Sequence, residues 1–282
     1  MANASLRKVH SDTSTQTRAK PFLKWVGGKT QLLPQIFELF PKSFNKYHEP
    51  FVGGGAVFFN LEPNKAILSD VNPDLIQAYQ MIRDDVDSVI AELKQHRAEE
   101  AYYYSVREAD VAELSAAEAA ARIIFLHKTC FNGLYRVNRR GKFNVPFGKY
   151  ANPTICNEKN LRAVSAALQG VDIRLQSVFE LDSRVRKNDL VYFDPPYVPL
   201  SPTASFTSYT KQGFGEHQQR ELAELFGRLV SKGAHCFLSN SDTPLVRELY
   251  KDFKIKKVYA RRAINSRADR RGPVGEVIVC SK

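Results

Sequence analysis

The residues best suited to chemistry in this sequence are Asp194, Pro195, Pro196 and Tyr197, which follow the apolar run Leu190–Phe193. The run predicts a buried strand, and the prolines end it because they cannot donate to a ladder. Asp194 should therefore lie at the carboxyl end of a central strand, where open α/β sheets bind ligands. The Asp194 carboxylate and the Asp194 or Pro195 carbonyl could accept two N–H bonds from an exocyclic amine, with Tyr197 stacked on its ring. A plain strand end followed by a proline turn is the alternative, and partner motifs must decide between them.

A glycine turn early in the chain is the first such partner motif. A short strand predicted at residues 47–51 runs into glycines at positions 53–55, and a helix pattern follows. Strand, glycine turn and helix is the form in which α/β proteins present backbone N–H groups to a nucleotide-like ligand. The strand pattern at residues 66–69 ends on Asp70, where such folds hold ribose hydroxyls. Because the spaced dinucleotide fingerprint is missing, the pattern favours a mononucleoside cofactor.

The sequence patterns of the helices and strands that must position these residues predict an α/β fold interrupted by a helical insertion. Amphipathic helical patterns follow one another over residues 73–131 without a strand between them, and Ser115 with Glu118 makes a capping box for the last. Two short strands around Arg139-Arg140-Gly141 predict a basic β-hairpin within residues 131–145. The predicted strands span residues 47–51, 66–69, 171–179, 190–193, 234–238, 254–259 and 276–280, and the helices span 31–40, 56–61, 73–83, 87–98, 102–109, 115–131, 216–231 and 243–253.

The same patterns predict how the chain divides into domains. We expect residues 1–20 to form a disordered tail, because they are polar, rich in Ser and Thr, and lack an apolar signal core. Residues 21–72 and 157–282 should form the two parts of a catalytic domain, and residues 73–156 an inserted domain. The long loop at residues 198–215 is typical of a lid or binding loop.

Composition and charge narrow the class of protein. The chain of 282 residues has a net charge of +11, which is typical of proteins that bind a polyanion. Residues 128–149 carry six Lys and Arg and no acid, and residues 256–271 carry seven against one Asp. Such runs are often merely solvated faces, but aromatic residues interleaved with the first run favour a nucleic-acid surface. No apolar run is long enough to span a membrane, and four scattered cysteines favour reduced thiols in a cytosol.

The order of the motifs resembles a known family. Phe51-Val52-Gly53-Gly54-Gly55, an inserted basic module, and then Asp194-Pro195-Pro196-Tyr197 resemble the α-group amino-methyltransferases. Lys24-Trp25-Val26-Gly27-Gly28-Lys29, Phe131-Asn132-Gly133-Leu134-Tyr135-Arg136 and the Phe-Asn-Val-Pro-Phe-Gly run at residues 143–148 narrow the resemblance to the Dam-type DNA adenine-N6 methyltransferases that modify GATC. The chain looks especially similar to the Dam relatives that accompany restriction enzymes. The resemblance covers roughly residues 21–280.

The resemblance implies a fold, a cofactor and a cofactor site. The fold is a Rossmann-like S-adenosylmethionine-dependent methyltransferase sheet with an inserted, mainly helical DNA-recognition domain that carries a β-hairpin. The cofactor is S-adenosylmethionine, and no metal is expected. Matched by position, Trp25 and Lys29 would line its methionine end, Phe51 and the Gly53 to Gly55 loop would pass beneath it, Asp70 would hold its ribose, Phe179 would pack on its adenine, and Asp194 would border the methyl donor.

The resemblance also implies a partner, double-stranded DNA with GATC sites. Its restriction-associated members add a second candidate partner, a cognate restriction endonuclease acting on the same site. The target adenine must leave the stack to enter a pocket, at a cost of a few kcal/mol. Asp194, Pro195 and Tyr197 would then be the catalytic residues, in a cytoplasmic, nucleoid-associated bacterial enzyme. The DNA contacts that the resemblance implies are Phe131 as a wedge between bases, Leu134 and Pro146 on thymine methyl groups, Arg136 on guanine and Tyr150 on the flanking backbone. From the residues themselves, Asn138 lies on the same predicted strand face as Arg136 and suits adenine in a major groove, and Asn132 is a further expected DNA contact.

One departure from the family and two alternatives complete the interpretation. The family often has an acid before the Phe at position 179, and Val178 stands there instead, which questions how the cofactor adenine is recognised. An RNA adenine or guanine methyltransferase could share the Asp194 motif, and a catalytically silent DNA-binding regulator could share the basic surface. The N4-cytosine enzymes usually carry Ser where Asp194 stands.

Overall fold

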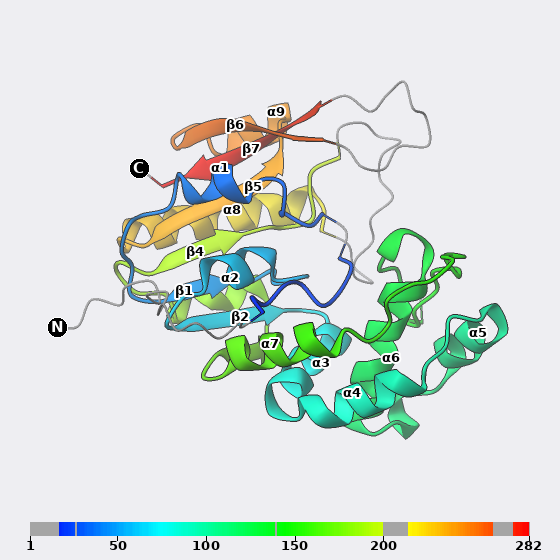
Figure 1. Ribbon diagram of the computed structural model, residues 1–282. Helices are drawn as coiled ribbons and strands as arrows, with labels where there is room; N and C mark the ends of the chain where they lie inside the picture. The colour runs from blue at the N-terminus through cyan, green and yellow to red at the C-terminus, as the bar shows by residue number, and fades with distance from the viewer. Residues whose placement is uncertain (1–16, 26, 139, 200–213, 262–272, 282) are drawn as a thin grey trace.

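The computed structural model describes residues 17–25, 27–138, 140–199, 214–261 and 273–281 (Figure 1). Its elements in chain order are α1 (Leu33–Phe37), β1 (Tyr47–Glu49), α2 (Ala56–Leu61), β2 (Ala66–Asp70), α3 (Pro73–Asp84), α4 (Val86–Gln95), α5 (Glu100–Glu108), η1 (Val111–Glu113), α6 (Ala116–Thr129), η2 (Phe131–Gly133), α7 (Glu158–Leu168), β3 (Asp172–Leu175), η3 (Val178–Ser183), β4 (Leu190–Phe193), α8 (Glu216–Ser231), β5 (His235–Ser241), α9 (Pro244–Leu249), β6 (Lys254–Arg261) and β7 (Pro273–Cys280), with η denoting 3₁₀-helices.

The described strands form one seven-stranded sheet in the order β3-β2-β1-β4-β5-β7-β6. Strands β1 to β5 run parallel, whereas β7 is antiparallel to both β5 and β6. The strand order reverses direction between β1 and β4, so the crevice outside the carboxyl ends of these two strands is the expected ligand site. The predicted α/β class, a Rossmann-like sheet with helices, is confirmed.

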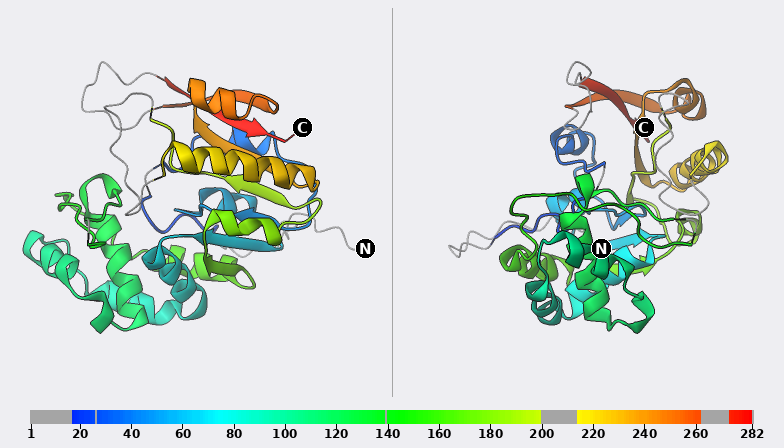
Figure 2. Two further views of the ribbon diagram at one scale, coloured as in Figure 1. Left: turned by 180° about the vertical axis from the view of Figure 1, so that it is seen from behind. Right: turned by 90° about the vertical axis from the view of Figure 1, so that its right-hand side faces the viewer.

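Helices cover both faces of the sheet, and this explains the continuous apolar run of β4. Leu190 and Tyr192 point into the core that includes α1, α3 and α6, while Val191 and Phe193 point into the core beneath α8. All four side chains are completely buried. Figure 2 shows α1 and α8 on opposite sides of the sheet. A strand buried on both faces needs apolar residues at every position, because side chains alternate between the faces.

The helical insertion extends from one edge of the sheet. Helices α4, α5 and α6 lie away from the strands, whereas α3 packs on β2, β3 and α7 (Figure 1). The predicted capping box of α6 is present, with Glu118 N–H bonded to Ser115 Oγ and Ser115 N–H bonded to Glu118 Oε2. Residues of α3, α4 and α6 belong to the same buried core as residues of β1, β2 and β4, so the predicted insertion packs continuously with the sheet.

Several sequence expectations differ from the structure or lie outside the described residues. The strand predicted at 171–179 ends at Leu175, because Ser177 and Glu180 form a capping box that starts a 3₁₀-helix. In place of the hairpin strands predicted within 131–145, the described residues form isolated antiparallel bridges, Val137 to Phe143 and, just outside, Cys130 to Phe147. Residues 17–20, assigned to the tail, are described, and Lys20 bonds the Asn160 side chain through its N–H and C=O. Most of the long loop at residues 198–215 and of the basic run at residues 256–271 falls at residues 200–213 and 262–272, outside the described residues.

None of the helices described is long and apolar enough to cross a membrane.

Candidate active site

Asp194 lies directly after β4, at the carboxyl end of the parallel strands, as the sequence predicts. The segment after it is held by two buried amides from other elements. Gln219 of α8 donates to the Pro196 carbonyl at 2.8 Å, and the Val198 N–H donates to Asn240 of β5 at 3.0 Å. The two amides also bond each other at 3.1 Å. A satisfied buried network of this kind fixes the backbone that carries Asp194, and sequence patterns gave no sign of it.

Lys29 reaches Asp194 from the first glycine-rich segment of the chain. Its Nζ lies 2.8 Å from Asp194 Oδ1 and 2.6 Å from the Gly27 carbonyl oxygen, and the side chain is almost completely buried. The same Nζ lies 4.8 Å from the centre of the Tyr197 ring. Burial raises the pKa of Asp194, and the Lys29 ammonium partly offsets this. A nitrogen donor therefore sits on the Asp194 carboxylate and over the Tyr197 face at once, which is the geometry expected for an exocyclic amine.

Tyr197 is fixed by a residue of β7. Its hydroxyl donates to Glu276 Oε2 at 2.7 Å, and burial raises the pKa of the Tyr197 hydroxyl well above its ordinary value. The bond anchors the ring beside Asp194 and Lys29. Glu276 was missed at the sequence level, because an acid in a late antiparallel strand has no local signal that places it beside position 197.

The glycine turn and Asp70 come together as predicted. Gly53 N–H donates to Asp70 Oδ2 at 3.4 Å, and Asn72 N–H donates to Asp70 Oδ1 at 3.1 Å. Gly53 adopts a φ of 46°, and a Cβ there would lie 2.9 Å from Trp25 Cδ1. Only glycine therefore lets the turn rest on the Trp25 indole. Burial raises the pKa of Asp70 to about 6.

Three phenylalanines meet near the same edge of the sheet. Phe51 and Phe214 make an edge-to-face contact with ring centres 5.7 Å apart, and Phe179 is stacked on Phe214 at 6.4 Å. Phe179 reaches this place from a 3₁₀-helix rather than from the predicted strand. Phe214, in the segment before α8, was not assigned to the site from the sequence.

Glu49 is a second acid at a strand tip that the sequence analysis missed. It ends β1, is buried, and its Oε2 accepts hydrogen bonds from the Tyr47 hydroxyl at 2.8 Å and the Phe58 N–H at 3.1 Å. Burial raises the pKa of Glu49 to about 8, so the carboxyl is largely protonated at neutral pH. An acid followed by proline occurs at positions 49, 62 and 194, so this pattern alone does not single out Glu49.

The recognition segment, which we define as residues 131–150, is more exposed. Phe131 is half exposed, and the Arg136 guanidinium donates to the Asn144 side chain at 2.7 Å and to its carbonyl at 3.0 Å. Asn138 Oδ1 accepts N–H bonds from Arg140 and Lys142, so this oxygen holds the turn. Among the other predicted DNA contacts, Asn132 has a φ of 56°, Leu134 is half-buried, Pro146 is exposed and accepts the Phe131 N–H at 2.9 Å, and Tyr150 accepts a bond from Lys24 Nζ at 2.9 Å.

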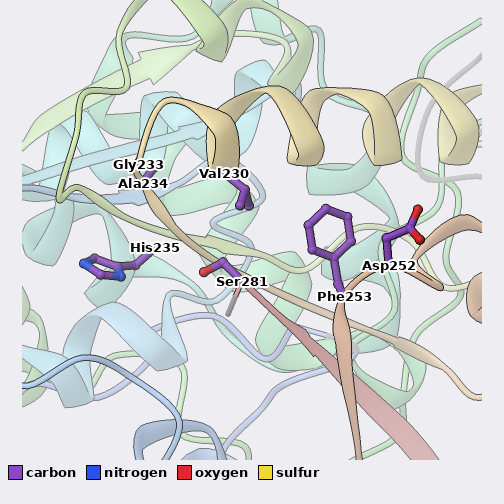
Figure 3. Close-up of a pocket in the computed structure, with 7 residues that line it drawn as sticks. All are labelled: Val230, Gly233, Ala234, His235, Asp252, Phe253 and Ser281. Carbon is purple, nitrogen blue, oxygen red and sulfur yellow. The ribbon is translucent and has the colours of Figure 1, made fainter.

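A cavity of about 330 Å³ lies elsewhere, between the end of α8, the start of β5 and Phe253 (Figure 3). Strand β5 begins at His235, which lines the cavity, whereas Asp194 follows the end of the parallel strand β4. The cavity is therefore at the opposite edge of the sheet from the predicted site residues, and it contains none of them.

Comparison with known proteins identifies a matching family and several similar proteins. The profile described as D12 class N6 adenine-specific DNA methyltransferase matches residues 25–264. A type II methyltransferase of Lactococcus lactis subsp. cremoris is 44% identical over 269 residues, which are 92% of this chain and 94% of the relative. A type II methyltransferase of Methanocaldococcus jannaschii is 46% identical over 274 residues, 89% of this chain and 95% of the relative. The DNA adenine methylase of Escherichia coli K12 is 36% identical over 267 residues, 93% of this chain and 95% of that enzyme.

Proposed function

Because the chain belongs to the D12 class of N6 adenine-specific DNA methyltransferases, we propose that it methylates the adenine of double-stranded GATC after that base has rotated out of the duplex. The family membership itself makes the chain an adenine-N6 DNA methyltransferase with S-adenosylmethionine as the methyl donor. The sequence of the target, the rotation of the base and the roles of individual residues are the proposal.

One observation carries the assignment of the amine site: the Lys29 ammonium sits on Asp194 and over Tyr197. An adenine amine taking this position displaces Lys29 and donates one N–H to the Asp194 carboxylate. The Pro195 carbonyl accepts the second N–H, and Tyr197 stacks on the purine. Two acceptors on the amine draw its lone pair out of conjugation with the ring, so the site works by positioning and by electrostatics.

The residues at the ends of β1 and β2 fit an adenosyl cofactor. Asp70 presents a carboxylate at a strand tip next to a glycine turn that no larger residue could form against Trp25. Val71, after Asp70, is 46% exposed and offers an apolar surface beside the acid. Asp70 would hold the ribose, and Gly53 with Trp25 would lie beside the methionine end. When bound, the cofactor supplies the electrophilic methyl group.

The proposal of GATC rests on the recognition segment. Arg136 is exposed and pre-oriented by Asn144, as a bidentate contact to guanine requires. Phe131 is half exposed on the same segment and can enter the space that a rotated base leaves. Two relatives are named type II methyltransferases, which supports a further proposal, that a restriction endonuclease recognises the same site.

Methyl transfer tests the proposal directly. Tritiated S-adenosylmethionine is incubated with the enzyme and with duplexes that differ only by GATC or GTTC. We expect incorporation into the GATC duplex alone, at N6 of its adenine. Equal labelling of both duplexes contradicts the proposed target. Labelling of RNA but of neither duplex favours the RNA methyltransferase, and cofactor binding without labelling of any substrate favours the silent regulator.

A further inference from the structure

The described residues of the recognition segment form isolated bridges and no strand, so single hydrogen bonds must hold them in place. Two of these bonds lie near the end of the segment. The Pro146 carbonyl accepts the Phe131 N–H at 2.9 Å, and the Gly148 N–H donates to the Thr129 carbonyl at 2.8 Å. Each residue of this stretch takes its position from a small number of bonds, so the groups that supply those bonds set where the proposed DNA contacts lie.

Arg136 is tied to the same stretch at Asn144. Its guanidinium donates to Asn144 Oδ1 at 2.7 Å and to the Asn144 carbonyl at 3.0 Å, and the Asn144 N–H donates to the Arg136 carbonyl at 3.0 Å. Three bonds between two residues fix one relative to the other. Whatever holds Asn144 therefore also holds the guanidinium that is proposed to read guanine.

Tyr103 holds the next residue, Val145, from outside the segment. In α5, which is described along its whole length, Tyr103 alone is buried. Its hydroxyl donates to the Val145 carbonyl at 2.8 Å, and Arg107 Nη1 donates to the same oxygen at 3.3 Å. The Tyr103 ring also packs against Phe147, with ring centres 5.3 Å apart. Burial raises the pKa of the Tyr103 hydroxyl, so the group keeps its proton and remains a donor.

Helix α5 is itself fixed to α6. The buried Arg122 side chain of α6 donates to the Val106 carbonyl at 2.8 Å and to the Arg107 carbonyl at 2.7 Å. Both carbonyls belong to the last turn of α5, where a helix leaves its carbonyls without intrahelical partners. Figure 1 shows α5 at the far end of the insertion from the strands. The support of Val145 is therefore anchored within the insertion and away from the strand tip that carries Asp194.

A buried tyrosine can serve packing alone, and the ring contacts of Tyr103 fit that interpretation. The hydroxyl distinguishes the two cases, because phenylalanine would fill the same space. It bonds the carbonyl that lies between Asn144, the partner of Arg136, and Pro146, which is expected to contact a thymine methyl group. A shift of that carbonyl would move both of the proposed DNA contacts.

We propose that Tyr103 is a positioning residue for recognition of the target sequence. Through the Val145 carbonyl it sets the positions of Arg136 and Pro146, although its own side chain is buried. Such support matters because the groups of a binding site must be held within about 0.5 Å of their working geometry. The inference rests on the proposed function, which supplies the GATC target and the roles of Arg136 and Pro146.

The test measures discrimination with two duplexes that each differ from GATC by one small change. In the first, 7-deazaguanine replaces guanine and lacks its N7 acceptor, and in the second, uracil replaces thymine and lacks its methyl group. The measured quantity is the ratio of kcat/KM on GATC to kcat/KM on each modified duplex. Tyr103→Phe keeps the ring and loses the hydroxyl, so both ratios should fall about two- to tenfold. The single-turnover rate at saturating GATC should change by less than about twofold, because the groups at the strand tip stay in place.

Two further variants check that the effect comes from the bond to Val145. Arg107→Lys keeps the charge but loses the planar fork that makes the longer bond to this carbonyl, so both ratios should fall by less than in Tyr103→Phe. Tyr104→Phe is the matched control, because Tyr104 is the next residue of α5 and is held through its ring, against Tyr103 and beneath the Arg107 guanidinium. It should keep both wild-type ratios.

A double variant shows whether Tyr103 acts through Arg136. In the Arg136→Lys background, Tyr103→Phe should cost no further discrimination at guanine, because both changes affect one contact, but it should still lower discrimination at thymine. A merely structural defect would reduce the amount of active enzyme. It would lower kcat/KM equally on every duplex and leave both ratios unchanged.

Hydrogen exchange supplies a measurement that does not depend on activity. In the free enzyme, the backbone amides of residues 143–148 should exchange faster in Tyr103→Phe than in the wild type, because the Val145 carbonyl has lost its shorter bond. The amides of residues 190–198 should exchange at the wild-type rate in the same sample.

The outcomes separate this inference from the proposed function. Wild-type ratios in Tyr103→Phe overturn the role of Tyr103 and leave the proposed function standing. A further loss of guanine discrimination in the double variant overturns that role as well. Wild-type enzyme that does not methylate the GATC duplex, or that treats the three duplexes alike, overturns the proposed target and this inference with it. If Tyr103→Phe is unfolded by thermal melting, the ratios of Arg107→Lys decide.

Discussion

The strand-tip site and the recognition segment are held in place by different means. We use "strand-tip site" for Asp194, Lys29 and Tyr197 with their supports Gln219, Asn240 and Glu276. Its side chains are largely buried and bonded to groups from α8, β5 and β7. The recognition segment places Phe131, Arg136, Asn138 and Pro146 in solvent. Its described residues form only isolated antiparallel bridges, Val137 to Phe143 and Cys130 to Phe147.

This difference fits the tasks proposed for the two regions. Chemistry at one amine requires acceptors fixed before the substrate arrives, because only preorganised groups cost nothing to reorganise during the reaction. A surface that reads a duplex gains from exposed cations, which release counterions and adjust to the grooves. Changes in the strand-tip site should therefore act on rate, and changes in the recognition segment on discrimination.

Among these variants, Asp194→Ala should have the largest effect. It removes the acceptor of the target amine and should lower the rate of methyl transfer about a thousandfold or more, while binding to the GATC duplex persists. Single-turnover transfer and DNA binding are measured on the same preparation. A variant that retains substantial activity contradicts the assignment of the amine site.

Gly53→Ala tests the proposed contact between the glycine turn and the cofactor. The new Cβ meets the Trp25 indole at 2.9 Å at a φ of 46°, so cofactor affinity should fall about tenfold or more. Gly170→Ala is the matched control, with a φ of 75° but nothing within 4 Å. It should cost only about 1–2 kcal/mol of stability through its backbone. Equal cofactor affinities in the two variants count against a cofactor contact at Gly53.

Arg136→Lys tests the recognition segment. It keeps the charge and loses the planar fork, so discrimination against a changed guanine should fall by about 1–3 kcal/mol, roughly 5- to 150-fold. The measurement is kcat/KM on GATC and on a duplex with that guanine replaced. Arg140→Lys, an exposed neighbour in the same turn, should leave the ratio unchanged. If Arg136→Lys lowers the rate but leaves the ratio of the two kcat/KM values unchanged, Arg136 does not act on discrimination, and the proposed separation of rate and discrimination is contradicted.

The last prediction concerns stability and its dependence on pH at Glu49. Its pKa in the folded protein is about 8, above the ordinary value of 4.5, so its stabilising contribution is complete below about pH 4.5 and is lost as the pH rises through 8. Glu49→Gln mimics the protonated acid and should raise the Tm at pH 8.5 but hardly change it at pH 5. A Tm difference that is the same at both pH values contradicts a buried, protonated Glu49.

Local sequence signals predicted the parts of the site that lie within one strand or turn. The β4 strand and the α2 and α8 helices have the predicted bounds, and the capping box of α6 is confirmed. Two prolines after an apolar run, and glycines that need φ above zero, act within a few residues. The 3₁₀-helix after β3 also had a signal, since Ser177 and Glu180 have capping-box spacing. The apolar pattern over residues 171–179 nevertheless led to the prediction of a strand across this capping box.

By itself, the sequence determined the fold class, the place of Asp194 at a strand tip and the glycine turn beside Asp70, because alternation, proline and glycine constrain the backbone locally. Only the tertiary structure decided which distant side chains meet there. Lys29 reaches Asp194, and Glu276 of β7 holds Tyr197. No spacing along the chain encodes those contacts, because each depends on how separate elements pack against one another.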